Sequence, residues 1–176
     1  EYFKNEEYTK AGAIILDTNV EVFAKADIIV KVKEPLKEEY DLFKEGQTLY
    51  TYLHLAANLE LTEALMERKV TGIAYETVQL EDRSLPLLHP MSEVAGRLAT
   101  QVGATALQKP HGGRGVLLGG VPGVAPGRVV VIGGGVAGLN AAVIALGMRA
   151  DVTVFDRSIN RLQYMDTIYG GRIKTL

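Results

Sequence analysis

The chain has 176 residues, of which 47% are hydrophobic and 23% are charged, and this composition is typical of a globular protein and excludes a disordered one. The formal net charge is only −2 and acidic and basic residues are interspersed, so neither nucleic acid nor a membrane surface is expected as a partner. Because cysteine is absent, disulfides and thiolate metal sites are excluded, and a reducing compartment such as the cytoplasm is the expected location.

The first half of the chain alternates between patterns typical of strands and of helices. Asn58 is expected to cap a helix at its start, and Gly46 to end one. The predicted strands lie at 13–16, 27–33, 48–54 and 70–76, and the predicted helices at 20–26, 36–44 and 59–69. Helices of this length between strands form βαβ units, so the last three strands should lie parallel in one sheet.

Three titratable residues fall at the carboxyl ends of those three strands: Lys33, His54 and Glu76. Parallel strands place these ends at one edge of the sheet, where ligands bind in open α/β folds. An ammonium, an imidazole and a carboxylate are therefore expected to lie near one crevice. The simpler interpretations are a surface lysine, a hydrogen-bonded core histidine and a solvated glutamate.

The segment at 79–90 contains two prolines and several turn residues, which indicates a connection between domains. We therefore divide the chain into 1–88, a portion of a substrate-binding domain, and 89–176, a portion of a nucleotide-binding domain. Ser92 is expected to cap a helix at 93–108.

The two remaining histidines, His89 and His111, lie beside prolines in predicted loops. They have no partners at metal-ligand spacing, so both are interpreted as surface residues and no metal site is expected. The glycine-rich stretch at 109–127 is too apolar for a flexible linker. It is expected to be an ordered loop that packs under the segment that follows it.

The stretch at 129–148, VVVIGGGVAGLNAAVIALGM, is apolar and long enough to raise the alternative of a membrane span. Three consecutive glycines disfavour a spanning helix, and strand, turn and helix is the better interpretation. The turn has the pattern G-x-G-x-x-G. Gly133 permits the tight turn, Gly135 lets backbone amides approach a pyrophosphate, and Gly138 allows the helix to pack closely on the strand.

A second strand at 151–155 leads to Asp156, which follows Gly133 by 23 residues. An acidic residue at this offset accepts hydrogen bonds from the adenosine ribose, and it repels a 2′-phosphate. NAD is therefore expected in preference to NADP, although Arg157 is adjacent. Arg149 is unusual, because a glycine would ease the turn between helix and strand at that position.

Five segments together resemble the bacterial alanine dehydrogenase family along essentially the whole chain. They are KVKEP (31–35), TYLHLAA (51–57), AYETV (74–78), PMSEVAGRLA (90–99) and GGRGVLLGGVPGV (112–124). This ordered set is far more specific than the glycine turn alone. The resemblance implies an α/β fold, with a parallel βαβ portion of the catalytic domain followed by the first part of a Rossmann NAD-binding domain.

The resemblance also implies an activity: the reversible NAD-dependent oxidation of L-alanine to pyruvate and ammonia, in a homo-oligomer that is typically a hexamer. Lys33 and His54 match positions that contact the substrate. Glu76 matches a position linked to a bound magnesium in some members of the family, but the histidine partner of that position would lie beyond Leu176. Lys33 is expected to hold the carboxylate or keto oxygen, and His54 to exchange a proton. The positions that match cofactor contacts are Ser92, Val136, Ala137, Asp156 and Arg161, beside Gly133, Gly135 and Gly138 of the turn.

Two features of the family are expected to lie outside this sequence. They are a strand with a substrate-binding arginine, which would precede Glu1, and an active-site aspartate, which would follow Leu176. The sequence is therefore interpreted as an internal fragment that is inactive by itself. Two alternatives stay open: a non-catalytic, NAD-binding regulatory module, and a transhydrogenase-like nucleotide-binding subunit. Within the matched region the departures are small, chiefly Arg149 and His111.

Overall fold

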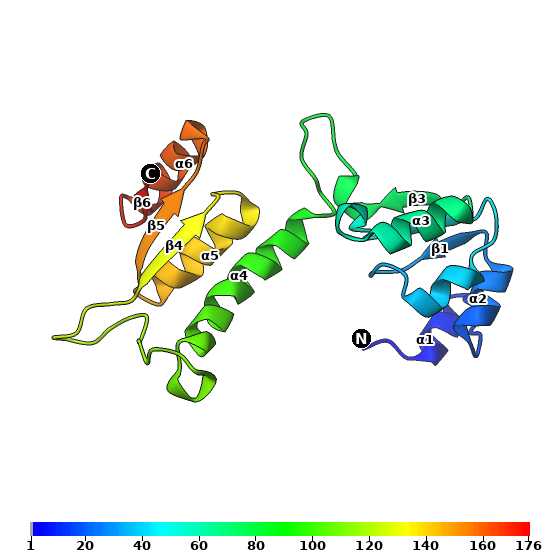
Figure 1. Cartoon of the computed structure of the whole chain (residues 1–176), viewed down its shortest axis with the longest axis horizontal. Coiled ribbons are helices and arrows are strands. Elements are labelled where there is room, and N and C mark those ends of the chain that lie inside the picture. Colours follow the sequence, from blue (N-terminus) through cyan, green and yellow to red (C-terminus); the bar gives the residue numbers. More distant parts are fainter. Residues whose placement is uncertain (1) are drawn as a thin grey trace. The chain divides into compact units, whose positions relative to one another are not determined.

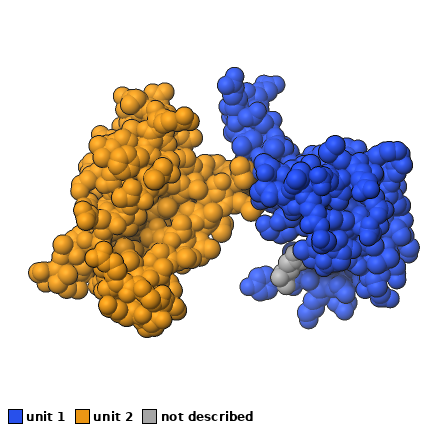
Figure 2. Space-filling model, viewed as in Figure 1, with its two compact units in different colours: residues 1–85 blue, residues 86–176 orange. Residues whose placement is uncertain are grey.

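The computed structural model describes residues 2–176, and the chain divides into two compact units, residues up to Leu85 (unit 1) and Pro86–Leu176 (unit 2). Figure 2 distinguishes the two units and Figure 1 labels the elements along the chain. Each unit contains a three-stranded parallel sheet with helices packed beside it. The α/β class predicted from the sequence is confirmed.

Unit 1 has a sheet with the strand order β1-β2-β3, and both strand pairs are parallel, as predicted. Its strands are β1 (Ile28–Val30), β2 (Thr48–Thr51) and β3 (Thr71–Ala74). Its helices and 3-10 turns are α1 (Asn5–Lys10), α2 (Asn19–Lys25), η1 (Lys37–Leu42), η2 (Leu55–Ala57), α3 (Leu59–Glu67) and η3 (Tyr75–Thr77). Asn58 caps α3 as predicted, because its side-chain oxygen accepts a hydrogen bond from the Leu61 N–H at 3.1 Å.

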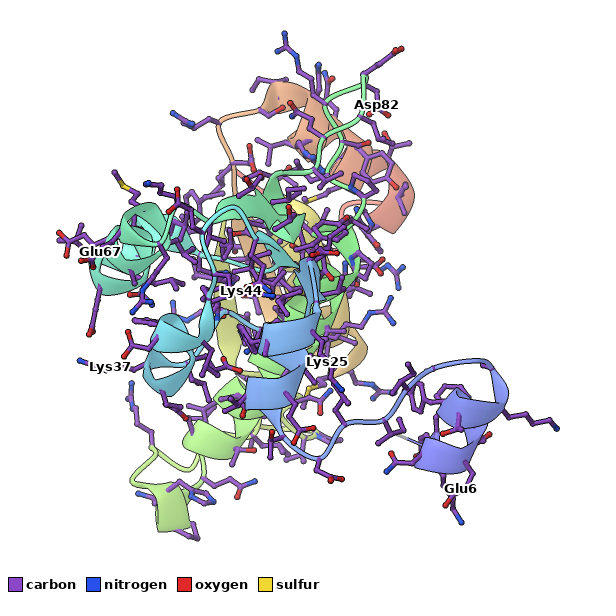
Figure 3. All side chains as sticks on the ribbon, turned by 90° about the vertical axis from the view of Figure 1, so that its right-hand side faces the viewer. Glu6, Lys25, Lys37, Lys44, Glu67 and Asp82 are labelled. Atoms are coloured by element: carbon purple, nitrogen blue, oxygen red, sulfur yellow. The ribbon has the colours of Figure 1, made fainter. Side chains whose placement is uncertain are left out.

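The core of unit 1 is built from aromatic and leucine side chains of the helices and the sheet. Phe23 of α2 meets Phe43 edge to face, with ring centroids 5.0 Å apart. Leu53, just after β2, belongs to the same cluster and is only 1% exposed. Charged side chains such as Lys37 and Glu67 point outward (Figure 3). The core therefore fixes the chain immediately before His54.

Three local expectations for unit 1 are wrong. Residues 13–16 form no strand, because nothing in the described sheet pairs with them. The segment 36–44 forms the six-residue 3-10 element η1 instead of an α-helix, and the Glu39 carboxylate accepts the Leu36 N–H at 2.8 Å at its start. Gly46 does not cap this element; it turns the chain toward β2 with φ +80°.

Unit 2 has the strand order β4-β5-β6, again all parallel. Its strands are β4 (Arg128–Ile132), β5 (Asp151–Phe155) and β6 (Lys174–Thr175), and its helices are α4 (His89–Ala106), η4 (Lys109–His111), α5 (Val136–Gly147) and α6 (Ile159–Tyr169). The stretch at 129–148 divides into β4, the glycine turn and α5. No helix within residues 2–176 is long and apolar enough to cross a membrane.

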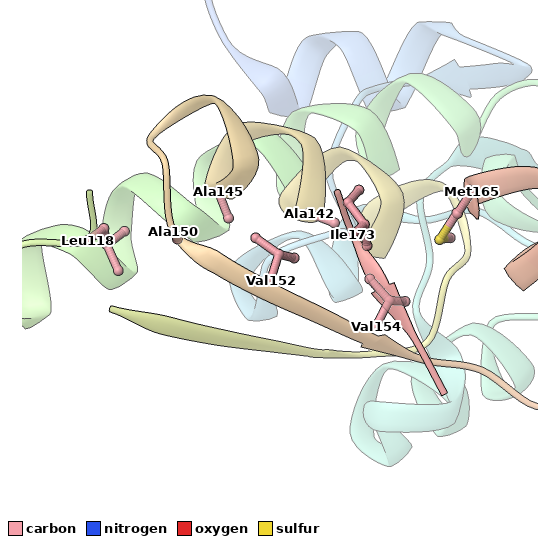
Figure 4. Close-up of a cluster of buried hydrophobic side chains, with 8 residues drawn as sticks. All are labelled: Leu118, Ala142, Ala145, Ala150, Val152, Val154, Met165 and Ile173. Atoms are coloured by element: carbon pink, nitrogen blue, oxygen red, sulfur yellow. The ribbon is translucent and has the colours of Figure 1, made fainter. Parts of the chain in front are cut away.

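The core of unit 2 lies between α5 and the sheet (Figure 4). Val152 and Val154 of β5 face Ala142 and Ala145 of α5, and all four are at most 1% exposed. Leu118 joins this cluster, so the glycine-rich stretch at 109–127 does pack under the segment that follows it, as expected.

Helix α4 packs closely along α5. The Thr100 hydroxyl donates a hydrogen bond to the Ala141 carbonyl at 2.9 Å, and Arg97 Nε donates to the Asn140 side chain at the same distance. Small residues on both helices permit this approach, which positions the amino end of α5.

Two expectations at the start of unit 2 are wrong. Helix α4 begins at His89, with Pro90 in its first turn, so His89 is helical and Ser92 lies inside the helix instead of capping it.

The expectation about Arg149 is confirmed: it has φ +64° in the turn between α5 and β5, a conformation that glycine adopts more easily.

Candidate functional site

The three titratable residues expected at the sheet edge of unit 1 lie in the turns after the strands. Strands β1, β2 and β3 end at Val30, Thr51 and Ala74, two or three residues before Lys33, His54 and Glu76. The buried Thr51 hydroxyl donates to the Lys33 carbonyl at 2.9 Å, which attaches the turn after β1 to β2. Because the strands are parallel, all three turns leave the same edge of the sheet.

His54 and Glu76 are in direct contact. Glu76 Oε1 accepts the His54 N–H at 2.7 Å and the Leu53 N–H at 3.2 Å, and His54 Nδ1 lies 3.9 Å from the same oxygen. Burial alone would raise the pKa of Glu76, but the backbone hydrogen bonds, with that from His54 the largest, hold the pKa below its ordinary value. Glu76 is thus an ionised partner of the histidine turn and not a solvated strand-end residue.

Lys33 lies beside Glu34, with 3.7 Å between Lys33 Nζ and Glu34 Oε2. That Glu34 oxygen is buried and has no hydrogen-bond partner among the described residues. A backbone hydrogen bond at Glu34 itself, and the charges of Lys33 and His54, hold the pKa of Glu34 below its ordinary value. Glu34 thus interacts with both predicted site residues. The predictions from the sequence missed it, although it is part of the KVKEP segment.

The reactive ends of Lys33 and His54 are open to solvent, with side chains 63% and 40% exposed. A lysine ammonium can hold a carboxylate or a polarised carbonyl oxygen, and an imidazole can exchange a proton near neutral pH. Two carboxylates, those of Glu34 and Glu76, lie beside them. The edge of unit 1 can therefore bind a small anion and perform general acid–base chemistry.

In unit 2 the glycine turn connects β4 to α5. Gly133 has φ +95°, and a Cβ on Gly138 would lie 1.8 Å from the Gly133 carbonyl oxygen, so both positions require glycine. Around Gly135 a Cβ would meet nothing within 4 Å, which leaves open space at the amino end of α5. The first amides of this helix, at Val136 and Ala137, begin the 12-residue α5 and can bind a phosphate group.

Asp156 follows β5 beside this turn. Its two carboxylate oxygens accept the Gly134 N–H at 2.5 Å and the Ser158 N–H at 2.7 Å. The hydrogen bonds from Ser158 and Gly134 hold the pKa of Asp156 below its ordinary value, so it is ionised at neutral pH. Each oxygen keeps a further lone pair that can accept a ribose hydroxyl. Asp156 thus also joins the glycine turn to the start of α6, a role that the sequence did not indicate.

A pocket of about 540 Å³ lies between the start of α4, α5 and α6. Arg161 lines this pocket together with Val136 and Ser158, and its charge contributes to the lowered pKa of Asp156. Ser92 lies on α4, between His89 and Glu93, which both line the same pocket and interact at 3.5 Å. The residues expected around a dinucleotide thus come from three helices, the glycine turn and the segment after β5 that carries Asp156, and Gly133 and Asp156 line a second pocket. Within residues 2–176, no group of three or more histidine, aspartate or glutamate side chains could hold a metal ion.

Comparison with known proteins gives a match in each half of the chain. The family model described as "Alanine dehydrogenase/PNT, N-terminal domain" matches residues 1–95, and "Alanine dehydrogenase/PNT, C-terminal domain" matches residues 99–176. An alanine dehydrogenase of Methanococcus maripaludis is 62% identical over 172 residues, which cover 98% of this chain and 46% of that protein. An alanine dehydrogenase of Staphylococcus saprophyticus is 59% identical over 175 residues, which cover 99% of this chain and 47% of that protein. The chain thus spans about half the length of these relatives.

Solved structures agree with the sequence matches. A structure named L-alanine dehydrogenase superposes with a TM-score of 0.85 at 53% identity, covering 99% of this chain and 48% of that chain. A transhydrogenase from Sinorhizobium meliloti superposes with a TM-score of 0.70 at 23% identity, covering 99% of this chain and 51% of that chain, which shows a common fold alone. The chain therefore belongs to the alanine dehydrogenase/PNT family.

Proposed function

We propose that this chain forms part of an NAD-dependent alanine dehydrogenase, which oxidises L-alanine to pyruvate and ammonia in a reversible reaction. The observation that carries the proposal is the identity of 59–62%, over nearly the whole chain, to two proteins of that name. The sheet edge of unit 1 supports it, because that edge brings a lysine, a histidine and two carboxylates together. In this proposal residues 1–88 contribute to substrate binding and residues 89–176 to cofactor binding.

The proposed roles in unit 1 follow from the chemistry of the substrate. The exposed ammonium of Lys33 holds the carboxylate or the keto oxygen of the substrate and polarises it. NAD held by the residues of unit 2 would supply the acceptor for the hydride that leaves the alanine Cα. Water then adds to the resulting imine, and ammonia leaves. His54 takes and returns the protons of these last two steps, for which an imidazole has the right acidity.

The proposed cofactor site in unit 2 consists of the glycine turn, Asp156 and the flanking helices. The open space at Gly135 and the amide groups that begin α5 fit a pyrophosphate. The ionised Asp156 fits an unmodified adenosine ribose and repels a 2′-phosphate, so NAD should be preferred to NADP. Arg161 and Ser92 complete the set from α6 and α4. We also propose, on the basis of the family, that the complete protein is a homo-oligomer, with a hexamer as the expected form.

The test is a steady-state assay of the complete protein that contains these residues. Incubation with L-alanine and NAD should produce NADH, pyruvate and ammonia in equal amounts, and NADP should support a much lower rate. If the protein binds NAD but forms no pyruvate from alanine, it is a nucleotide-binding module without this activity. Light scattering of the same preparation would test the proposed oligomer.

A further inference from the structure

The backbone of His54 has an unusual conformation. His54 has φ +50° and ψ +35°, in the left-handed region that side chains other than glycine seldom adopt. The residue before it, Leu53, is 1% exposed, and its Cδ1 would lie 3.1 Å from a Cβ placed on Gly72 of β3. The chain therefore leaves the core and enters the 3-10 turn η2 through a left-handed residue at the histidine.

The carboxylate of Glu76 stabilises this conformation. Its Oε1 accepts the His54 N–H at 2.7 Å and the Leu53 N–H at 3.2 Å, and its Oε2 also accepts the Leu53 N–H at 3.3 Å. The distance from Oε1 to His54 Nδ1, 3.9 Å, is too long for a hydrogen bond. Glu76 thus forms a hydrogen bond with the backbone of His54 and not with its imidazole ring.

Glu76 is itself held by the packing of its neighbour. The Tyr75 ring meets the rings of Tyr50 and Tyr52 edge to face, with centroids 4.3 Å and 4.9 Å apart. The 3-10 turn η3 is further fixed by the Thr77 hydroxyl, which donates to the Ala74 carbonyl at 3.1 Å. The carboxylate is therefore attached to β3 on one side and to the histidine turn after β2 on the other.

We propose that Glu76 is a positioning residue, which keeps the His54 backbone in its left-handed conformation so that the imidazole faces the substrate at the sheet edge. This inference rests on the proposed function, in which His54 exchanges protons with the substrate. The length of the Glu76 side chain and its oxygen Oε1 matter most, and its charge matters less, because Oε1 receives both amides and Oε2 receives only the Leu53 N–H, at the longer distance of 3.3 Å.

Two conservative substitutions in the complete protein distinguish the effect of the length of the Glu76 side chain from the effect of its charge. Glu76→Gln keeps the length and one acceptor oxygen but removes the charge, so kcat for alanine oxidation should fall only about threefold to fivefold, because a neutral acceptor is weaker. Glu76→Asp keeps the charge but is shorter by one methylene, so both amides lose their acceptor. Its kcat should fall by roughly 10- to 100-fold, the usual effect of a displacement near 1 Å. Glu63→Gln on the exposed face of α3 is the matched control and should leave kcat unchanged.

Three further measurements complete the test. The affinity for NAD of Glu76→Asp should stay close to that of the parent protein, because the cofactor residues lie in unit 2, and its melting temperature should fall, because the Leu53 and His54 amides lose their acceptor. In the double variant with His54→Asn, Glu76→Asp should cause no further loss of kcat, because Glu76 acts through His54.

Two outcomes would overturn the positioning role. One is a lower kcat in Glu76→Gln than in Glu76→Asp, and the other is an additive loss of kcat in the double variant. If His54→Asn itself retains full activity, the proposed function of His54 is wrong, whatever the Glu76 variants do.

Discussion

Gly96 of α4 lies so close to Ala137 of α5 that a Cβ on Gly96 would stand 2.1 Å from the Ala137 carbonyl oxygen. Ala137 belongs to the first turn of α5, directly after the glycine turn. The contact therefore fixes the end of the helix that is proposed to bind the pyrophosphate. A backbone atom cannot move away as the end of a flexible side chain can, so the two helices have to separate if Gly96 gains a methyl group.

We expect Gly96→Ala to destabilise unit 2 by about 1–3 kcal/mol, the usual cost of overpacking, and to weaken NAD binding. Gly103→Ala, on the same helix, is the control. A Cβ there would meet nothing within 4 Å, so this change should stabilise the helix by roughly 0.5–1 kcal/mol. Denaturant unfolding of both variants would measure the difference, and equal stabilities would contradict the close packing of α4 on α5.

The preference for NAD should depend on Asp156. Asp156→Ala should lower the ratio of NAD affinity to NADP affinity by roughly tenfold or more, because the variant loses both the charge-assisted hydrogen bonds to the ribose and the repulsion of a 2′-phosphate. The ratio is the informative quantity, since the loss of the hydrogen bonds from Gly134 and Ser158 would weaken both cofactors. Asp151→Ala, at the other end of β5, should leave the ratio unchanged. Titration with both cofactors decides this, and an unaltered ratio in Asp156→Ala would remove Asp156 from the ribose site.

Arg149 offers a stabilising substitution. A left-handed conformation costs an ordinary residue roughly 1–2 kcal/mol, and glycine avoids that cost but loses about 0.5–1 kcal/mol of chain entropy on folding. Arg149→Gly should therefore raise the free energy of unfolding by about 0.5–1 kcal/mol. Arg114→Gly, at an exposed position outside the left-handed region, should lower it slightly. Thermal or denaturant unfolding would measure both changes, and the free energy of unfolding should rise in Arg149→Gly and fall in Arg114→Gly.

The sequence predicted the elements whose signals are local. The strand β5 has the predicted bounds, and the glycine turn and the Asn58 cap lie where their residue types placed them. Spacing along the chain also placed Lys33 and His54 at one edge of the sheet, where the ends of parallel strands meet. The strands end earlier than predicted, so both residues lie in the turns that follow the strands and not in the strands themselves.

Other features depend on contacts between distant segments and were not predictable in this way. Ser92 has the chemistry of a cap, but Pro90 allows α4 to begin a turn earlier. The left-handed conformation of His54 depends on a carboxylate 22 residues away, at Glu76. The interaction of Glu34 with the charge of His54, 20 residues away, likewise appears only once the sheet is formed.

Acid should weaken unit 1 through Glu76. Because the pKa of Glu76 is lower in the folded protein than in the unfolded chain, its ionised form stabilises the fold. That stabilisation is complete above the unfolded pKa of about 4.3 and is lost as the pH falls through the lowered folded pKa. The difference in stability between the parent protein and Glu76→Gln should be constant above about pH 5 and shrink below it. Unfolding curves at several pH values would measure this stability difference. A difference that grows in acid would contradict a lowered pKa of Glu76 in the folded protein.

The proposed catalytic role of His54 gives the sharpest test. His54→Ala should lower alanine oxidation by roughly 10²- to 10⁴-fold, the usual range for the loss of a positioned acid or base. The affinity for NAD should stay near its original value, because the cofactor residues lie in unit 2. His54→Asn should show the same loss of turnover with less loss of stability, since asparagine adopts the left-handed conformation readily and cannot exchange protons. His111→Ala, at an exposed histidine of unit 2, is the control and should keep full activity.

A structural histidine would give a different result, with a lower melting temperature and weaker binding but nearly intact turnover per folded molecule. Measuring turnover, NAD affinity and melting temperature on these three variants therefore distinguishes a proton-transfer group from a residue that only supports the turn.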